Sequence, residues 1–563
     1  MKNVKKVLLT SSLVFVLSAC SIHFGGNTLD WQKLKNSGTG IDLMSDKVSN
    51  TKLSFDKSSF EQAMKKADED VVNNKNVYTF NGDFSKVSNS FASLREKLTI
   101  ARARYAADGS ASMKNTYSEL YDTYLSFFTW YYPFLLHIKE GSKEIYDAFF
   151  GDMTPFEVND YINAFIYNEE TKKLDKEISD LQDSQEEKHN EFIKGWRAGT
   201  IKKDDEKYIA YMKESLVNYR ELLSKGNEYA KIFEFDNYYD FVYKNYYNRD
   251  YKYDFVDDYA ALVDQYIIPT IKYYDEHVDK SILDNPTKKD FYTRFFSSNI
   301  ADINCFQGDL LDAYVDMMGG DMKETYTHLK QSGYYVFSNN ENSLGTAYVS
   351  SSMDDPLIFF SKNYQGVMTI THEFGHYFAA CTNEYNNSFP FDIEETHSQA
   401  NEMLLTSYLT TYYAQDANLD LYKYIKDYCA YDMLTGVIAP MAVAEVESYV
   451  FENLKLTDDQ LLEGINTIMN KYDGMVYSAY WATPVVSSPG YYISYATSGV
   501  GAIGVYIQAQ ENFSKAKDNY LRFVSYPKES QNIDSIYTYA GFYSPLQEST
   551  FQKITPENLF SFA

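Results

Sequence analysis

Apolar residues recur with the period of an α-helix through most of the first 330 residues, and no other feature constrains the fold as strongly. Three stretches show the spacing: Phe60, Ala63, Met64, Ala67 and Val71; Leu174, Ile178 and Leu181; and Met212, Leu216, Tyr219 and Leu223. Because an α-helix has about 3.6 residues per turn, such residues share one face that can be buried. The pattern predicts that residues from about 55 to 330 are mostly helical.

The period changes near residue 332, where three short runs are rich in β-forming residues. These runs are Tyr334 to Ser338, Thr346 to Ser350 and Leu357 to Ser361, and turn-forming residues separate them. They predict a small antiparallel sheet. The helical pattern returns over most of the remaining chain, so the predicted fold class is mainly α with a minor sheet.

The N-terminus carries the pattern of an export signal. Three lysines within the first six residues precede an apolar run, Val7 to Leu17, that is too short to cross a bilayer. The run ends in Leu-Ser-Ala-Cys, which resembles the bacterial lipobox. That resemblance implies cleavage before Cys20, lipid on that cysteine, and a protein anchored on the extracytoplasmic side of a bacterial cell membrane. The alternative is an ordinary signal peptide in which the cysteine is coincidental.

The length of 563 residues exceeds the usual size of one compact domain, so two lobes are expected. We expect a lipoprotein signal peptide over residues 1–19 and a flexible tether over 20–50, because glycine, serine and asparagine are frequent after Cys20. The change of period divides the rest into an N-terminal helical lobe, 51–330, and a second lobe, 331–563.

Charge and cysteine content exclude several classes of protein. The formal net charge is −27, so nucleic acid and anionic lipid are poor partners. An acidic surface can favour basic substrates, although its simpler use is solubility. Beyond Cys20 the chain has Cys305, Cys381 and Cys429, an odd number without Cys-x-x-Cys spacing. This composition argues against a disulfide framework and against a thiolate metal site.

The stretch THEFGHYFAA, residues 371 to 380, holds two of the eight histidines of the chain. On a helix, positions four apart share a face, so His372 and His376 can present ring nitrogens to one zinc ion, with Glu373 beside them. Gly375 lowers helix propensity, which suggests that another part of the backbone approaches closely there. The alternative is a pair of histidines that serve only the packing of a helix.

A catalytic zinc site keeps three protein ligands and one water, so a further ligand must come from elsewhere. Asp392 is a plausible N-cap for the next helix, which offers several candidates. These are Glu394, Glu395, His397 and Glu402, with Glu395 and Glu402 on one face and Glu394 and His397 on a neighbouring one. Helix geometry alone does not rank them.

The His372-Glu-Phe-Gly-His376 motif followed by the sequence from Asp392 to Gln399 resembles the M3 family of zinc metallopeptidases, the thimet oligopeptidase and oligoendopeptidase F family. The resemblance extends back through residues 344–348 and 363–366 and forward to about 506, and it is weak in the N-terminal half. It implies that Glu395, which precedes a serine by three positions, is the third ligand of one Zn²⁺ per chain. It also implies two helical lobes that enclose a deep channel, with the small antiparallel sheet beside the zinc-binding helix.

The same resemblance implies a zinc-dependent endopeptidase that hydrolyses short oligopeptides, with residues 331–563 as its catalytic lobe. Glu373 would activate a zinc-bound water as general base. The family's Tyr-x-x-Tyr spacing assigns the catalytic tyrosines to Tyr492 and Tyr495. Tyr491 is a reserve for that pair and a candidate substrate-binding residue.

One departure from the family concerns a histidine that well-known members carry a few residues before these tyrosines and that contacts substrate. The last histidine here is His397, and residues 483–485 are Thr-Pro-Val. That contact must be absent or replaced. His397, two residues after the third ligand, is a candidate to support a metal ligand from behind and so compensate for the missing histidine, with a buried helix histidine as the alternative.

Family members bind the peptide backbone along an edge strand near the zinc helix. The run Thr346 to Ser350 is the expected edge, and Gly345, Ala347 and Tyr348 are the predicted substrate-binding residues there. Main-chain pairing of this kind gives affinity with little sequence preference.

Two other functions fit the same residues. One is a zinc carboxypeptidase of a related helical fold, which also carries His-Glu-x-x-His and a downstream glutamate helix. The other is a peptide-binding lipoprotein without turnover, suggested by the missing histidine. The intact set of His372, Glu373, His376 and Glu395 argues against the second, because such costly buried polar groups would be lost first.

Overall fold

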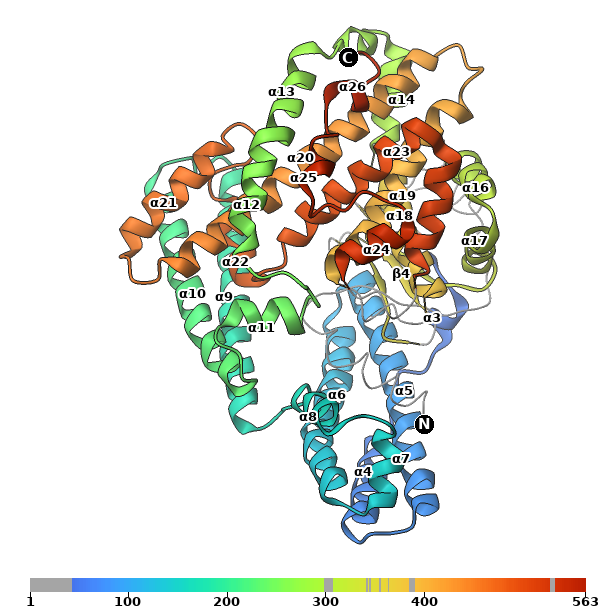
Figure 1. The fold of residues 1–563 in the computed structure, drawn as a ribbon, viewed down its shortest axis with the longest axis vertical. Helices are drawn as coiled ribbons and strands as arrows, with labels where there is room; N and C mark the ends of the chain where they lie inside the picture. Colours follow the sequence, from blue (N-terminus) through green and yellow to red (C-terminus); the bar gives the residue numbers. More distant parts are fainter. Residues whose placement is uncertain are drawn as a thin grey trace. The chain divides into compact units, whose positions relative to one another are not determined.

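The structure is a computed structural model that describes residues 43–297, 307–340, 343, 346–353, 356–362, 364–383, 390–526 and 532–563. The predicted signal peptide, Cys20 and most of the tether therefore lie outside the described residues, as do Gly345 and Cys305. The described chain is mainly helical with a small sheet, which confirms the predicted fold class (Figure 1).

Two compact units divide the chain. The first comprises Met1–Lys172, Phe295–Gly308 and Gly319–Glu373, and the second comprises Lys173–Arg294, Asp309–Met318 and Phe374–Ala563. In the first unit the sheet packs with the early helices, and in the second the long helices after residue 172 pack with the C-terminal part of the chain. The lobe boundary expected at residue 330 stays a prediction.

The first unit is built on a group of antiparallel helices with an aromatic core. Its helices are α3 (Asp46–Asn50), α4 (Lys57–Val72), α5 (Val77–Asp108), α6 (Ala111–Glu140), α7 (Lys143–Phe150), α8 (Pro155–Asn163) and α17 (Gly320–Ser332). Helices α5 and α6 lie side by side (Figure 1), and the rings of Phe91 and Phe127 stack between them at 3.9 Å. Gly109 ends α5 with φ +65°, a conformation that glycine adopts without a Cβ clash.

The sheet of the first unit has the order β1-β2-β4-β3. Its strands are β1 (Leu43–Met44), β2 (Tyr334–Phe337), β3 (Ala347–Ser350) and β4 (Leu357–Phe360). Three of them match the predicted runs, and the two-residue β1 was not predicted. Strand β4 lies between β2 and β3. It runs antiparallel to β3 and parallel to β2. The sheet is therefore mixed, and the expectation of a purely antiparallel sheet was wrong for the β2–β4 pair.

Hydrogen bonds tie this sheet region to α5. The Ser338 hydroxyl donates to the Ala107 carbonyl at 3.0 Å, and the hydroxyls of Thr99 and Ser352 lie 2.6 Å apart. These contacts link positions more than 200 residues apart in the sequence, which is why the first unit combines the beginning of the chain with residues 319–373.

The second unit is all helical in its described residues. Its longer helices are α9 (Glu169–Arg197, which begins in the first unit), α10 (Glu206–Ile232), α19 (Phe391–Tyr412), α20 (Leu419–Glu452), α21 (Asp458–Lys471) and α23 (Ile493–Val524). Shorter ones are α11 (Tyr238–Asn245), α12 (Phe255–Leu262), a π-helical turn (Val263–Ile267), α13 (Ile268–His277), α14 (Pro286–Phe295), α16 (Gln307–Met318), α22 (Pro484–Ser487), α24 (Ile533–Ala540), α25 (Glu548–Phe551) and α26 (Pro556–Leu559). Short 3₁₀ turns cover Lys280–Asp284 and Tyr480–Ala482. Helix α18 (Val367–Thr382) continues across the division between the units.

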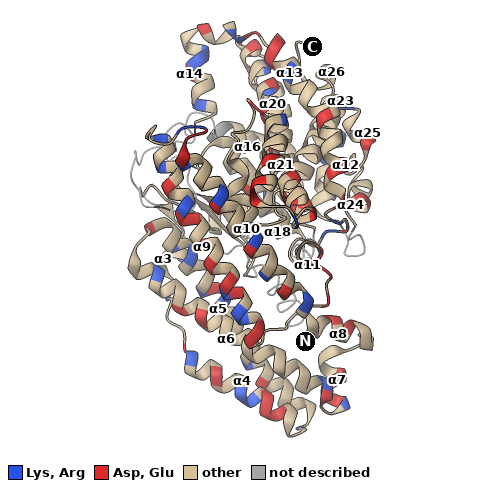
Figure 2. Cartoon of the chain, turned by 90° about the vertical axis from the view of Figure 1, so that its left-hand side faces the viewer, with Lys and Arg blue, Asp and Glu red and all other residues tan. Residues whose placement is uncertain are grey.

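Helix α9 is fastened to the C-terminal part of the chain by buried amides. The Gln185 side chain donates to the Ala482 carbonyl at 3.0 Å, and Gln182 donates to the carbonyls of Val486 and Ser487. The outer helices carry acidic and basic residues interspersed, as Figure 2 shows for α4 and α9. This arrangement agrees with a solvated face.

Helix α20 is long and apolar enough to cross a membrane by length and composition, and it is the one such helix within the described residues. In the structure, 61% of its apolar window is buried among other helices. That burial is typical of a central core helix.

Candidate active site

The histidine motif lies on α18, as the sequence predicts. His372 and His376 are one helical turn apart, and together with Glu395 of α19 they form a group whose ligand atoms all lie within 4.8 Å of one another. His376 Nε2 is 3.8 Å from Glu395 Oε2. The side chain of His376 is 8% exposed and that of Glu395 is 5% exposed. Two imidazoles and a carboxylate thus converge at a nearly buried point.

Gly375 allows α18 and α19 to approach this closely. A Cβ atom at that position would lie 2.6 Å from the Ser398 Cα and 2.7 Å from the His397 carbonyl oxygen. Both atoms belong to the backbone of α19, so no side-chain movement could relieve the contact. The predicted close approach of backbone to Gly375 is therefore present, and it sets the distance between His376 and Glu395.

The donor set fits a zinc ion. Nitrogen and oxygen ligands bind zinc at roughly 2.0–2.2 Å, which places neighbouring donors of a tetrahedron roughly 3.3–3.5 Å apart. The 3.8 Å between His376 and Glu395 exceeds this only slightly. Glu373, 6% exposed, lies on α18 next to His372. The residues could therefore hold the ion, with a carboxylate close to it.

The other candidate ligands have different surroundings. His397 is 1% exposed, and its ring meets that of Phe523 edge-on at 5.4 Å. Burial lowers the pKa of His397 to about 3, so this imidazole stays neutral. Burial, together with the neighbouring Glu395 charge, raises the pKa of Glu394 to about 8. Among the described residues, the group that could hold a metal contains Glu395 and neither of these two side chains.

One tyrosine hydroxyl contacts the Glu395 carboxylate, and a second tyrosine hydroxyl lies beside the first. Tyr491 donates to Glu395 Oε1 at 3.2 Å, and the hydroxyls of Tyr491 and Tyr495 lie 2.6 Å apart. Burial and the charges of Tyr495 and Glu395 raise the pKa of Tyr491 well above its usual value, so it stays a donor. The ring of Tyr492 instead packs against those of Tyr480 and Tyr491. The signal for the Tyr491–Tyr495 pair is their four-residue spacing across the start of α23.

The start of α19 differs from the prediction. Pro390 is its N-cap and makes no side-chain cap bond, whereas Asp392 lies inside the first turn and is 1% exposed. The N-cap prediction for Asp392 was wrong because its carboxylate accepts hydrogen bonds from Arg249 and Tyr251 instead. Sequence reasoning missed Arg249 altogether.

Where family members carry the late histidine, the Thr483 side chain is hydrogen-bonded. Its hydroxyl lies 2.8 Å from that of Tyr211, and Tyr211 in turn lies 3.0 Å from His189 Nδ1. A histidine from α9 is thus connected to this position through one tyrosine.

The predicted substrate strand is an edge strand. Strand β3 pairs with β4 on one side and ends the strand order on the other. Tyr348 is 3% exposed, with its ring stacked on Phe359 at 5.0 Å and the Arg102 guanidinium over it. The Tyr348 side chain is therefore engaged in packing, while Ala347 is half-buried.

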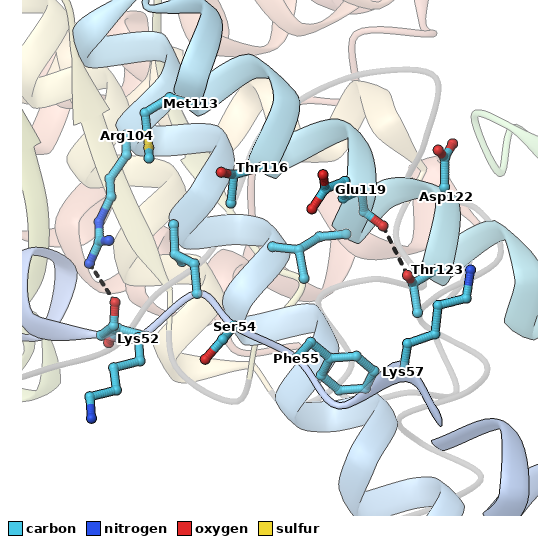
Figure 3. Close-up of a pocket in the computed structure, with 13 residues that line it drawn as sticks. Lys52, Ser54, Phe55, Lys57, Arg104, Met113, Thr116, Glu119, Asp122 and Thr123 are labelled. Atoms are coloured by element: carbon cyan, nitrogen blue, oxygen red, sulfur yellow. Dashed lines mark hydrogen bonds between the residues drawn. The ribbon is translucent and has the colours of Figure 1, made fainter. Parts of the chain in front are cut away.

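A hollow of about 820 Å³ lies in the first unit (Figure 3). Two of its polar side chains are engaged in local contacts: Arg104 donates to the carbonyls of Val48 and Thr51, and Thr123 donates to that of Glu119. The Arg104 bonds hold the segment before α4 against α5.

Solved structures share this fold. One, described as an oligoendopeptidase F, has a TM-score of 0.61 at 15% identity and covers 91% of this chain and 97% of its own. PZ peptidase A, solved with an inhibitor, has a TM-score of 0.58 at 14% identity over 90% and 97% of the two chains. Oligoendopeptidase-F from Enterococcus faecium has a TM-score of 0.52 at 13% identity over 88% and 95%. The fold is thus that of the helical oligoendopeptidases.

A curated relative supports the same assignment from sequence. It is an oligoendopeptidase F homologue of Borreliella burgdorferi, 26% identical over 232 residues, which are 37% of this chain and 39% of that protein. The alignment thus spans less than half the length of the curated relative. No family model matches the chain. Sequence and fold together confirm the predicted resemblance to the M3 family of oligoendopeptidase F.

Proposed function

We propose that the protein is a zinc-dependent endopeptidase that hydrolyses short oligopeptides. The observation that carries the proposal is the convergence of His372, His376 and Glu395 within 4.8 Å, on helices that Gly375 lets approach. The similar proteins named above are peptidases by name, which supports the reaction class.

The chain's own groups account for the proton transfers. A zinc ion held by the three ligands would act as a Lewis acid: it would polarise a peptide carbonyl and lower the pKa of water. Glu373 accepts a proton from the attacking water on its carboxylate and delivers it to the leaving amine nitrogen. The Tyr491 hydroxyl has one proton, which it donates to Glu395, so the neighbouring Tyr495 hydroxyl is the one that donates to the oxygen that gains negative charge. Tyr492 stays a second candidate for this role.

Metal analysis combined with a peptide-cleavage assay tests this function. We expect one zinc per chain and cleavage of an internally quenched peptide blocked at both ends, with activity lost on chelation and restored by zinc. A carboxypeptidase would leave the blocked peptide intact. A binding protein without turnover would retain the peptide uncut, and either result would contradict the proposal.

For the substrate, we propose that the peptide backbone pairs with the open edge of β3, near Ala347. Such pairing predicts weak dependence on side chains. Replacing one backbone amide of a good substrate by an ester should raise KM without changing kcat, and an unchanged KM for every ester position would contradict the pairing.

For the location, we propose a lipid anchor at Cys20 on the extracytoplasmic side of a bacterial membrane. The lipobox-like sequence supports it. The wild-type protein should enter the detergent phase in a phase-partition experiment, and Cys20→Ala should stay in the aqueous phase. Equal partition of the two proteins would contradict a lipid on Cys20.

A further inference from the structure

Arg249 is a fully buried cation in the second unit, between α11 and α12. Its side chain is 0% exposed, and its guanidinium bonds to two segments that are distant in sequence. Nε donates to Asp392 Oδ2 at 2.9 Å. Nη1 donates to the Gly490 carbonyl at 2.6 Å, and Nη2 donates to the Tyr491 carbonyl at 3.4 Å. Arg249 therefore connects the first turn of α19 to the backbone around Tyr491.

Both partners of Arg249 lead directly to the site. Asp392 lies three residues before Glu395 on α19 and also accepts a hydrogen bond from the Tyr251 hydroxyl at 2.6 Å. Residues 488–495, here called the Tyr491 segment, carry the hydroxyl that donates to Glu395 Oε1. Ser494 of this segment accepts a bond from Arg249 and lies 3.4 Å from Asp392. The Arg249 guanidinium thus joins α19, which carries the predicted metal ligand Glu395, to the Tyr491 segment, which carries the hydroxyl that donates to Glu395.

The surroundings of Arg249 hold it in one orientation. Its guanidinium carbon lies 4.4 Å and 4.6 Å from the ring centres of Tyr243 and Tyr247, which favours a planar cation over an ammonium. The Tyr247 hydroxyl donates to the Pro489 carbonyl at 3.0 Å. On the other side of the Tyr491 segment, the Gly490 N–H donates to Glu447 of α20 at 2.8 Å.

We propose that Arg249 is a positioning residue that fixes the Tyr491 hydroxyl against the Glu395 carboxylate, an inference that rests on the proposed function of this site. The physical reason is the shape of the guanidinium. Its planar fork satisfies Asp392 and two carbonyls together, whereas a lysine ammonium keeps the charge pair but cannot present donors in that plane. Loss of the fork frees the Tyr491 segment while Asp392 remains paired.

The test compares Arg249→Lys with Arg220→Lys. Arg220 is a matched control because, like Arg249, it bonds one aspartate and two backbone carbonyls. Its partners are Asp458 and the carbonyls of Leu454 and Leu456, in a different part of the second unit. Hydrogen–deuterium exchange is measured for all peptides of each protein, and zinc affinity is measured by competition with a chelator. Cleavage kinetics are measured for both variants and in a Tyr491→Phe background.

In Arg249→Lys we expect several-fold faster exchange confined to the Tyr491 segment, and zinc binding weaker by about 10-fold through the loosened outer-shell bond to Glu395. We expect kcat to fall by up to about 100-fold with little change in KM, as a small misplacement of a positioned group can cause. In the Tyr491→Phe background the same substitution should add little further loss. Arg220→Lys should leave all three measurements near wild type.

Unchanged exchange in the Tyr491 segment, or a full additional loss in the Tyr491→Phe background, would overturn the proposal, because Arg249 would then act on the fold as a whole. If Arg249→Lys does not fold, Ser494→Ala removes one partner of the guanidinium and should give the same pattern at smaller size. If the wild-type protein neither binds zinc nor cleaves peptides, the proposed function fails. The difference in hydrogen–deuterium exchange of the Tyr491 segment between Arg249→Lys and Arg220→Lys would still show whether Arg249 positions that segment.

Discussion

The candidate site has two regions: helices α18 and α19, which carry the predicted metal ligands, and the Tyr491 segment, whose hydroxyl donates to Glu395. Different interactions hold these two regions. Helices α18 and α19 are set by one-turn spacing between His372 and His376 and by one backbone contact at Gly375. The Tyr491 segment is held by side chains from elsewhere in the chain, including Tyr247, Arg249 and Glu447. The first region depends on local geometry, and the second depends on a buried polar network.

This difference predicts different responses to substitution. A change in the helix pair should directly affect metal binding or the proton transfer, because the predicted ligand His372 and the predicted base Glu373 lie on the same turn. A change in the network around the Tyr491 segment should act through position or protonation, and its effect should be smaller and dependent on pH.

The largest effect is expected for Glu373→Gln in the helix pair. Glutamine keeps the shape but cannot accept the proton, so cleavage should fall by about 10²–10⁴-fold while zinc content stays at one per chain. Single-turnover cleavage and metal analysis measure the two quantities. The exposed Glu463→Gln on α21 is the control and should match wild type. Undiminished cleavage by Glu373→Gln would remove Glu373 as the base, and loss of zinc would instead make it part of metal binding.

The next effect concerns the contact between α18 and α19. Gly375→Ala places a methyl group 2.6 Å from the Ser398 Cα, so the helices must separate and Glu395 must move from His376. We expect the free energy of unfolding to fall by about 1–3 kcal/mol and zinc to bind more weakly. Gly436→Ala on α20, where nothing lies within 4 Å of the added methyl, should raise the free energy of unfolding by up to about 1 kcal/mol. Denaturant unfolding with and without zinc measures both. If Gly375→Ala changed the free energy of unfolding as Gly436→Ala does, α18 and α19 would accommodate the added methyl group without loss of stability.

The comparison also explains what the sequence could predict. His372, Glu373, His376 and the close approach at Gly375 follow from the geometry of one helix, so a single stretch of sequence shows them. Glu395 needed the family resemblance, because four side chains of α19 were possible ligands. Three of the four strands were visible as β-forming runs, whereas the parallel β2–β4 pairing arises because β4 inserts between β2 and β3.

The Tyr491 segment could not be predicted in the same way. The resemblance assigned Tyr492 and Tyr495, whereas the structure brings Tyr491 and Tyr495 together beside Glu395. Which tyrosine turns toward Glu395 depends on Arg249, which lies 143 positions before Asp392 and 241 before Gly490 of the segment. No local pattern marks an arginine as buried. The division into compact units was hidden for the same reason, since it depends on which distant helices α9 and α10 pack against.

A pH-dependent effect is expected from Glu447, which accepts the Gly490 N–H. Burial raises the pKa of Glu447 to about 8, above that of an unfolded glutamate. The folded state therefore retains a proton that the unfolded state releases, and stability contributed by the neutral carboxyl is lost as the pH rises toward 8. Glu447→Gln, which stays neutral, should gain stability relative to wild type by on the order of 1 kcal/mol per pH unit over this range. Thermal unfolding from pH 5 to pH 8.5 measures the difference, and a constant difference across that range would show that Glu447 titrates normally.

The smallest effect is expected at Thr483, near the expected position of the family's late histidine. Its hydroxyl is engaged with Tyr211 at 2.8 Å, and Tyr211 also contacts His189. Thr483→Val removes one hydrogen bond of this chain and should lower the free energy of unfolding by about 1 kcal/mol, with kcat/KM unchanged. Tyr211→Phe, which breaks the same bond from the other partner, is the control. A fall in kcat/KM for Thr483→Val that Tyr211→Phe does not share would mean that the Thr483 hydroxyl contacts substrate.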